Sequence, residues 1–120
     1  MDSRRFERLV EQAIENLPEE FRERLENIDI VVEDTPTRAQ LRGGKRGETL
    51  LGLYEGVPLT ERGNNYGFVT PDKVTVFQKA IESFCKNDNE IVAEVERVVI
   101  HEIAHHFGIS DARLEELGLG

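Results

Sequence analysis

Residues 101–111 of this chain read HEIAHHFGISD and contain all three of its histidines. Residues four apart on an α-helix lie on nearly the same side, so His101 and His105 can both bind one metal ion. Glu102 follows the first histidine and can act as general base toward a metal-bound water. Gly108 can adopt the left-handed conformation that ends a helix. The chain can then turn back and bring Asp111 up as a third ligand.

Zinc is the metal that these side chains suit. It accepts imidazole nitrogen and carboxylate oxygen, and a catalytic site keeps three protein ligands and an open position for water. His101, His105 and Asp111 are the predicted ligands. Glu102 would take a proton from the bound water and pass it to a leaving amine. The alternative is a solvent-facing helix on which the motif arises by chance.

The residues before the motif predict a long helix that holds the histidines. Asn87 and Glu90 have the spacing of a capping box at its start, and the helix should end near Phe107. Five apolar residues recur with helical spacing and should face the core: Val92, Val95, Val99, Ile103 and Phe107. A metal site on a helix anchored by its own apolar side gains the rigidity that ligand geometry requires.

The rest of the pattern mixes helices and strands. Helical spacing or a helix-opening proline predicts helices over residues 3–16, after Pro18, over 78–85 and after Asp111. β-Branched or alternating stretches predict strands over residues 28–33, 49–54 and 73–77. A glycine-rich turn at 43–47 and a long polar loop at 56–71 complete the pattern, and loops of that length are often functional.

Composition excludes several classes of partner. The 120 residues suit one domain, residues 1–120, and the net charge of −9 argues against nucleic acid, whose phosphates need a basic surface. No apolar run is long enough for a membrane span, and the N-terminal segment is amphipathic, unlike a signal peptide. The single cysteine, Cys85, excludes an internal disulfide and fits a reducing compartment. We therefore expect a cytoplasmic protein.

Several side chains near the motif have alternative roles. His106 points about 100° away from His105, so it cannot join the same ligand set, and packing or hydrogen bonding is favoured over catalysis for it. Asp111 could cap the last helix, although ligation is favoured. Cys85 should be a small buried hydrophobe. Tyr54 and Tyr66 could donate to an oxyanion, but ordinary packing is favoured for both.

With these residues, the chain resembles the small bacterial zincin-like metallopeptidases, the minimal zincins, over about residues 6–118. The resemblance rests on residues 17–21, 31–34, 53–60, 101–111, 113–114 and 116–118. It implies an α+β fold in which a small mixed β-sheet packs on helices. The helix that carries His101, Glu102 and His105, called the HExxH helix, lies beneath the sheet. It also implies zinc held by His101, His105 and Asp111, with Glu102 as the base.

Two departures from the larger metzincin proteases bear on activity. Asp111 stands where those enzymes place a third histidine, and there is no Met-turn, since Met1 is the only methionine. Only residues 112–120 follow Asp111, so the substrate site should be shallow, or completed by the 56–71 loop or another chain.

The first hypothesis is a zinc-dependent metallopeptidase that cleaves peptides or a specific protein. A substrate strand could pair with a sheet edge at residues 49–54. A zinc-stabilised binding or regulatory module without turnover is the main alternative, and a metal hydrolase of a non-peptide amide is a third. The sequence leaves the substrate and the oligomeric state open.

Overall fold

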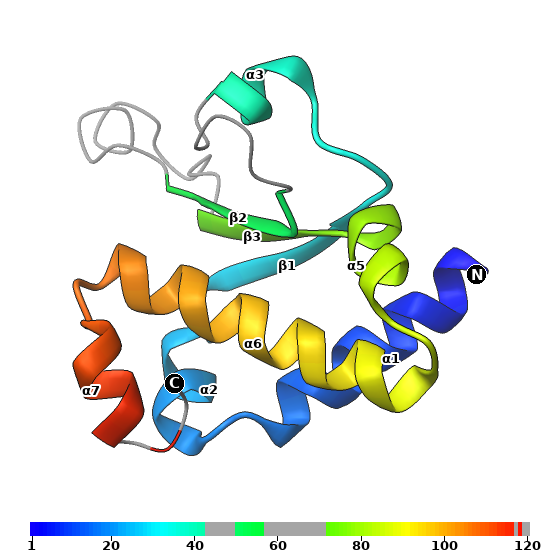
Figure 1. Cartoon of the computed structure of the whole chain (residues 1–120). Helices are drawn as coiled ribbons and strands as arrows, with labels where there is room; N and C mark the ends of the chain where they lie inside the picture. The colour runs from blue at the N-terminus through cyan, green and yellow to red at the C-terminus, as the bar shows by residue number, and fades with distance from the viewer. Residues whose placement is uncertain (43–49, 57–71, 117, 119–120) are drawn as a thin grey trace.

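Helices lie at both ends of the chain and strands between them, and the computed structural model describes residues 1–42, 50–56, 72–116 and 118 (Figure 1). In order, the elements are α1 (Ser3–Asn16), α2 (Glu19–Arg24), β1 (Ile28–Glu33), α3 (Arg38–Arg42), β2 (Gly52–Glu55), β3 (Asp72–Phe77), α5 (Gln78–Phe84), α6 (Asp88–His106) and α7 (Asp111–Glu116). The predicted turn at 43–47, the predicted loop beyond Gly56 and Tyr66 lie outside the described residues.

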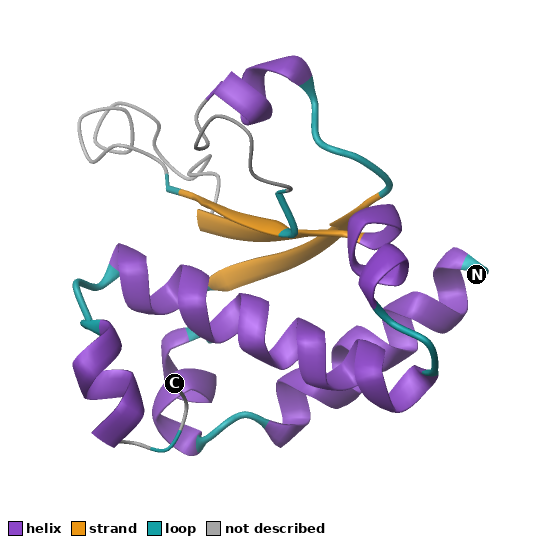
Figure 2. Cartoon of the chain, viewed as in Figure 1, coloured by secondary structure: helices purple, strands orange, loops and turns teal. Residues whose placement is uncertain are grey.

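A three-stranded mixed sheet crosses the middle of the molecule, with α6 and α1 beneath it (Figure 2). The strand order is β1-β3-β2, so β3 is central. β1 runs parallel to β3 with Ile30 opposite Val74, and β2 runs antiparallel to β3 with Tyr54 opposite the same residue. The predicted α+β fold, with a small mixed sheet above the HExxH helix, is confirmed.

The core lies between the sheet and the helices. Val74 and Val76 of β3 point toward α6 and are fully buried there. Burial of one such side chain contributes about 1.5–3 kcal/mol. The helical side of this core consists mainly of Phe6, Val10, Ala13, Phe21, Val95, Val99 and Ile103. Thr75 and Phe77, on the other face of β3, are buried as well, so the central strand is covered on both faces.

The long helix α6 has the limits that its sequence predicts within one residue. The Asn87 side chain accepts a hydrogen bond from the Glu90 N–H at 2.9 Å, so Asn87 is the N-cap, as predicted. The Glu90 carboxylate accepts from the Asn87 side-chain Nδ2 at 3.0 Å and from the Lys86 backbone N–H at 3.1 Å, whereas a regular capping box uses the backbone N–H of the N-cap residue. In the described parts of the chain, neither α6 nor a shorter helix has the length and hydrophobicity needed to cross a membrane.

One helix, α3, was not predicted. Its start is fixed by Thr37, whose hydroxyl accepts from the Gln40 N–H at 3.1 Å while Gln40 Oε1 accepts from the Thr37 N–H at 2.8 Å. This reciprocal pair is a capping box. The helix is only five residues long, so it has no apolar repeat for a hydrophobic pattern to detect.

Candidate metal centre

The end of α6 is shaped by a left-handed glycine, as the sequence predicts. Gly108 has a φ of +72°. Its N–H donates to the His105 carbonyl at 3.3 Å, and the Ile109 N–H donates to the Ala104 carbonyl at 2.8 Å. These two bonds form a Schellman motif, which terminates a helix and reverses the chain. Ile109 then packs against the core and holds the turn in place.

The last helix, α7, starts directly after this turn. The Ser110 hydroxyl accepts a hydrogen bond from the Arg113 N–H at 3.1 Å, which makes Ser110 the N-cap. Asp111 is the first residue of the helix itself. The alternative in which Asp111 caps α7 is therefore wrong, because the preceding serine already has that role.

His101 and His105 project from successive turns of α6. Their ring centroids are 6.1 Å apart, with an angle of 71° between the ring planes. A zinc–nitrogen bond of about 2.0–2.1 Å places each imidazole centroid roughly 3.2 Å from the ion, so two ligand centroids can be about 6.4 Å apart at most. The observed pair lies within that limit. His105 is also exposed enough to rotate toward a tetrahedral arrangement, since its side chain is 67% accessible.

The third predicted ligand stays a prediction. The side chain of Asp111 lies outside the described residues. Among side chains that are described, no three from His, Cys, Asp and Glu gather where they could share an ion. Cys85 precedes the opposite end of α6 and packs against the core as a small hydrophobe, as expected. Imidazole nitrogens beside a helix C-terminus, where backbone carbonyls carry partial negative charge, fit a divalent cation.

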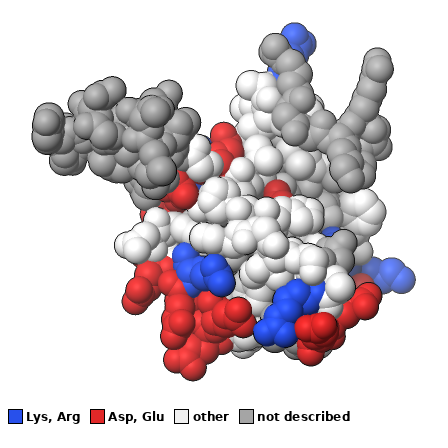
Figure 3. Space-filling model, turned by 90° about the vertical axis from the view of Figure 1, so that its left-hand side faces the viewer, with Lys and Arg blue, Asp and Glu red and all other residues white. Residues whose placement is uncertain are grey.

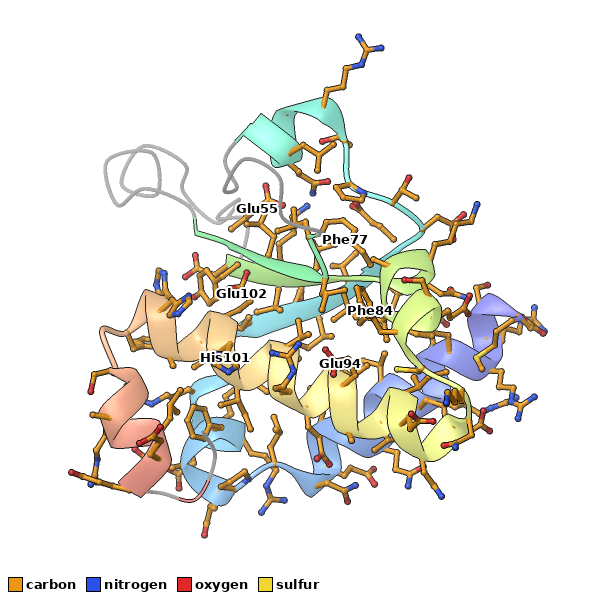
Figure 4. All side chains as sticks on the ribbon, in the orientation of Figure 1. Glu55, Phe77, Phe84, Glu94, His101 and Glu102 are labelled. Atoms are coloured by element: carbon orange, nitrogen blue, oxygen red, sulfur yellow. The ribbon has the colours of Figure 1, made fainter. Side chains whose placement is uncertain are left out.

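Glu102 lies on the side of α6 that faces the sheet (Figure 4). The backbone N–H of Tyr54 in β2 interacts with the Glu102 carboxylate. Oε2 is 4.0 Å from His105 Nδ1. Burial raises the pKa of the Glu102 carboxyl, while His105 and the Tyr54 N–H act in the opposite direction. A carboxyl with a raised pKa beside a candidate metal ligand has the properties that proton transfer at neutral pH requires.

One row of α6 lies directly beneath β2. The row consists of Val98, Glu102 and His106, which are four residues apart. It meets three alternate residues of the strand region, namely Gly52, Tyr54 and Gly56. Four helical residues rise about 6.0 Å and two strand residues span about 6.6 Å, so the two rows stay in step.

Gly52 permits the closest approach between this row and the strand. A Cβ atom at Gly52 would lie 2.4 Å from Val98 Cγ1 and 3.1 Å from the Thr75 carbonyl oxygen. A larger residue fits only if the strand or the Val98 side chain shifts. The contact therefore fixes the height of β2 above α6, and with it the position of the Tyr54 N–H over Glu102.

His106 packs against the same strand. Its ring stacks on Tyr54 with the centroids 3.8 Å apart and an angle of 14° between the planes. The Tyr54 hydroxyl donates to Asp72 Oδ2 at 2.6 Å. His106 therefore packs against β2, the role that was favoured for it from the sequence. The contact of Tyr54 with the motif, and the support of Tyr54 by Asp72, were missed because only the folded chain brings these strands over α6.

Phe107 does not face the core as predicted. Because α6 ends at His106, Phe107 is the C-cap residue and is 43% exposed. The Arg24 guanidinium lies over its ring, 4.7 Å from the centroid. A cation–π contact of this kind contributes about 0.5–1 kcal/mol at an exposed site. The other four residues of the predicted stripe are buried.

The end of the molecule that carries α7 and the C-terminal part of α6 is acidic at its margin. Acidic side chains gather along the lower edge of this face with basic ones among them, and the middle is largely uncharged (Figure 3). An acidic margin attracts cations and repels polyanions. The face thus suits a cation site.

Comparison with known proteins identifies the family of this chain and a solved structure with a similar fold. The family model for zincin-like metallopeptidases matches residues 25–120. Among solved structures, a conserved hypothetical protein from Thermus thermophilus is similar, with a TM-score of 0.58 and 23% sequence identity. The match covers 89% of this chain and 94% of that one. Because the identity is low, this likeness concerns the fold alone. No curated protein matches the chain.

Proposed function

The chain belongs to the zincin-like metallopeptidase family, and from that premise we propose that it is a zinc-dependent peptidase with Glu102 as general base. His101, His105 and Asp111 hold the metal in this proposal. Family membership supports a metallopeptidase in general terms and confirms the resemblance seen in the sequence. The roles of the individual residues are our proposal.

The observation that carries the proposal is the position of Glu102. The carboxyl is half-buried between the ligand helix and the edge strand, and burial raises its pKa. It lies within 4.0 Å of His105, a candidate ligand. A surface glutamate on a solvated helix would have neither the burial nor the nearby Tyr54 N–H. This environment favours proton transfer over a purely structural role.

Proton transfer gives Glu102 two tasks in peptide hydrolysis. When bound, zinc supplies a Lewis acid that polarises the scissile carbonyl and acidifies a water molecule. Glu102 accepts the proton of the attacking water and then gives it to the nitrogen of the leaving amine. The raised pKa helps the carboxyl to keep the proton between these two steps.

The edge strand β2 offers a binding surface for the peptide. β2 pairs with β3 on one side, and no other strand in the described parts of the chain pairs with its outer side. An extended peptide can add to such an edge through backbone hydrogen bonds. The scissile bond would then lie beside Glu102, because Tyr54 of β2 is directly above that carboxyl.

Metal content of the purified protein is the first test. We expect about one zinc per chain, as a mononuclear site requires, and its loss in His105→Ala. His106→Ala is the matched control, because His106 faces the strand and not the ligand pair. Retention of zinc in His105→Ala, or absence of zinc from the zinc-supplied wild type, would remove the proposed site.

Hydrolysis of a peptide library is the second test. Glu102→Gln should keep zinc and lower kcat by about 10²–10⁴-fold, the range for a general base. Glu96→Gln, the same substitution on the same helix, should keep full activity. If zinc raises the melting temperature but no peptide is cut by the wild type, the zinc-stabilised binding module becomes the better description.

A further inference from the structure

A groove opens between α1 and β1, at the edge of the sheet opposite β2. It has a volume of about 450 Å³. Its apolar lining comes from Val10, Ile14, Ile30 and Val32. Its polar lining comes from Glu7, Glu11 and Glu15, all on α1. The groove therefore has an apolar floor and an acidic wall, which consists of Glu7, Glu11 and Glu15. No residue of α6 lines it.

The strand beside the groove has one unpaired edge. β1 pairs with β3, and no other strand pairs with it among the residues that the structure describes. Ile30 and Val32 alternate along the strand, so both face the groove. An edge strand of six residues next to an apolar trough can accept an extended segment by backbone pairing.

The three glutamates of the wall lack ionic partners within the described chain. Some surface charges are paired, as in Arg5–Asp88, Arg97–Glu94 and Arg113–Glu116. The described residues offer no ion pair to the wall. Spaced four apart, its glutamates repel one another along α1. The wall keeps an uncompensated negative charge beside the trough.

We propose that this groove binds an extended segment of another protein that carries Lys or Arg at alternate positions. Alternate residues of a strand are about 6.6 Å apart, and the wall glutamates follow at about 6.0 Å, so three basic residues match them in register. The aliphatic stems of Lys or Arg cover apolar surface while their charged heads reach carboxylates. Backbone pairing with β1 fixes the segment in the trough.

A second copy of this chain is a poor occupant. Pairing of two β1 edges would bring two acidic walls together in a protein whose net charge is already −9. Like charges that face each other across an interface oppose association. Charge complementarity therefore points to a basic partner.

The test uses two labelled hexapeptides of equal composition, Arg-Thr-Arg-Thr-Arg-Thr and Arg-Arg-Arg-Thr-Thr-Thr. Fluorescence anisotropy measures their affinities, and NMR amide shifts locate the bound peptide. The alternating peptide should bind roughly tenfold more tightly, since only it can place three charges in register. Amide shifts should concentrate in β1, and added salt should weaken binding.

Substitutions in the protein complete the test. Combined Glu7→Gln, Glu11→Gln and Glu15→Gln should weaken binding of the alternating peptide roughly tenfold. Combined Glu20→Gln, Glu23→Gln and Glu26→Gln is the matched control with the same charge change on exposed positions away from the groove, and it should change affinity little. Circular dichroism confirms that each variant is folded.

Three outcomes would overturn the proposal. These are equal binding of both peptides, equal loss of affinity in both triple variants, or amide shifts that lie outside both α1 and β1. Concentration-dependent dimerisation that the Glu7, Glu11 and Glu15 substitutions strengthen would identify a second copy as the occupant instead. The inference does not depend on zinc or on Glu102, so its failure would leave the proposed peptidase untouched.

Discussion

The two edges of the sheet meet the helices in opposite ways. At β2, Gly52 is so close to Val98 of α6 that a single added carbon would clash. At β1, a groove of about 450 Å³ separates the strand from α1. The close edge fixes a backbone N–H over a catalytic candidate, Glu102. The open edge leaves apolar surface and unpaired charge for a partner. Proximity of strand and helix thus distinguishes a surface suited to chemistry from one suited to docking.

Adding volume at each edge of the sheet should give the largest difference in the free energy of unfolding between the two edges. Gly52→Ala should lower the free energy of unfolding by about 1–3 kcal/mol, because β2 must move away from α6. Val32→Phe, which adds volume to the open groove, should cost less than about 1 kcal/mol. Chemical denaturation measures both.

A double substitution tests the cause of the Gly52 effect. Val98→Ala removes the methyl group that a Cβ at Gly52 would meet. Gly52→Ala combined with Val98→Ala should therefore cost less than the sum of the two single changes, with coupling of about 0.5–3 kcal/mol. Simple additivity would show that Val98 does not set the height of β2.

Removal of the left-handed glycine after α6 should have the next largest effect. Gly108 has a φ of +72° and Gly118 one of +76°, and both have open space around them. Alanine in this conformation costs about 1–2 kcal/mol, so each variant should lose a similar amount of stability. If Asp111 is a ligand, only Gly108→Ala should also weaken zinc binding, as calorimetry can measure. Equal zinc affinity in both variants would argue against Asp111.

Local patterns in the sequence predicted much of the fold, because the interactions behind them are local. The N-cap at Asn87 fixes the start of α6, and the i, i+4 spacing of His101 and His105 places both on one side of the helix. The capping box at Thr37 went unnoticed because no apolar repeat follows it. A short helix such as α3 has no apolar repeat, so it can be predicted only from its capping pattern.

The environment of the candidate base could not be predicted in this way. Tyr54 and Asp72 come near Glu102 and His106 only through the pairing of β2 with β3 above α6. A sequence pattern shows that Gly52 and Tyr54 alternate, but not which helix row lies beneath them. The placement of Phe107 failed for a related reason, since helix periodicity was extended one residue past the helix end. Ligation by Asp111 stays a prediction.

The stacked rings of Tyr54 and His106 at the close edge should contribute moderately to the free energy of unfolding. His106→Ala removes a ring that lies 3.8 Å from Tyr54, and an aromatic pair contributes about 0.5–1.5 kcal/mol beyond buried area. His106→Phe restores the ring and should recover stability and, if the stack positions β2, the kcat for peptide hydrolysis. Recovery of stability without kcat would give His106 a chemical role beyond packing.

Stability as a function of pH reports the environment of Glu102 in zinc-free protein. Burial raises the pKa of Glu102 in the folded state. At pH values between its unfolded-state and folded-state pKa, the native state therefore binds more protons than the unfolded state. The free energy of unfolding then falls as pH rises through that window. Glu102→Gln should be more stable than wild type at neutral pH, and the difference should vanish in acid. Thermal melts between pH 4 and pH 8 measure this, with Glu96→Gln as control. If the wild type instead gains stability relative to Glu102→Gln as pH rises, the Tyr54 N–H outweighs burial.

The smallest expected change in stability comes from substitutions at the open edge, beside β1. Glu7, Glu11 and Glu15 form two like-charge pairs at i, i+4 on α1, and each such pair destabilises a helix by about 0.2–0.5 kcal/mol. Replacing all three by glutamine should therefore stabilise the protein slightly at low salt, and high salt should remove the gain. The same substitutions should weaken binding of a basic strand. A wall that costs stability but supports binding is what a docking surface requires, whereas a wall whose removal lowers stability would have a structural role within the fold.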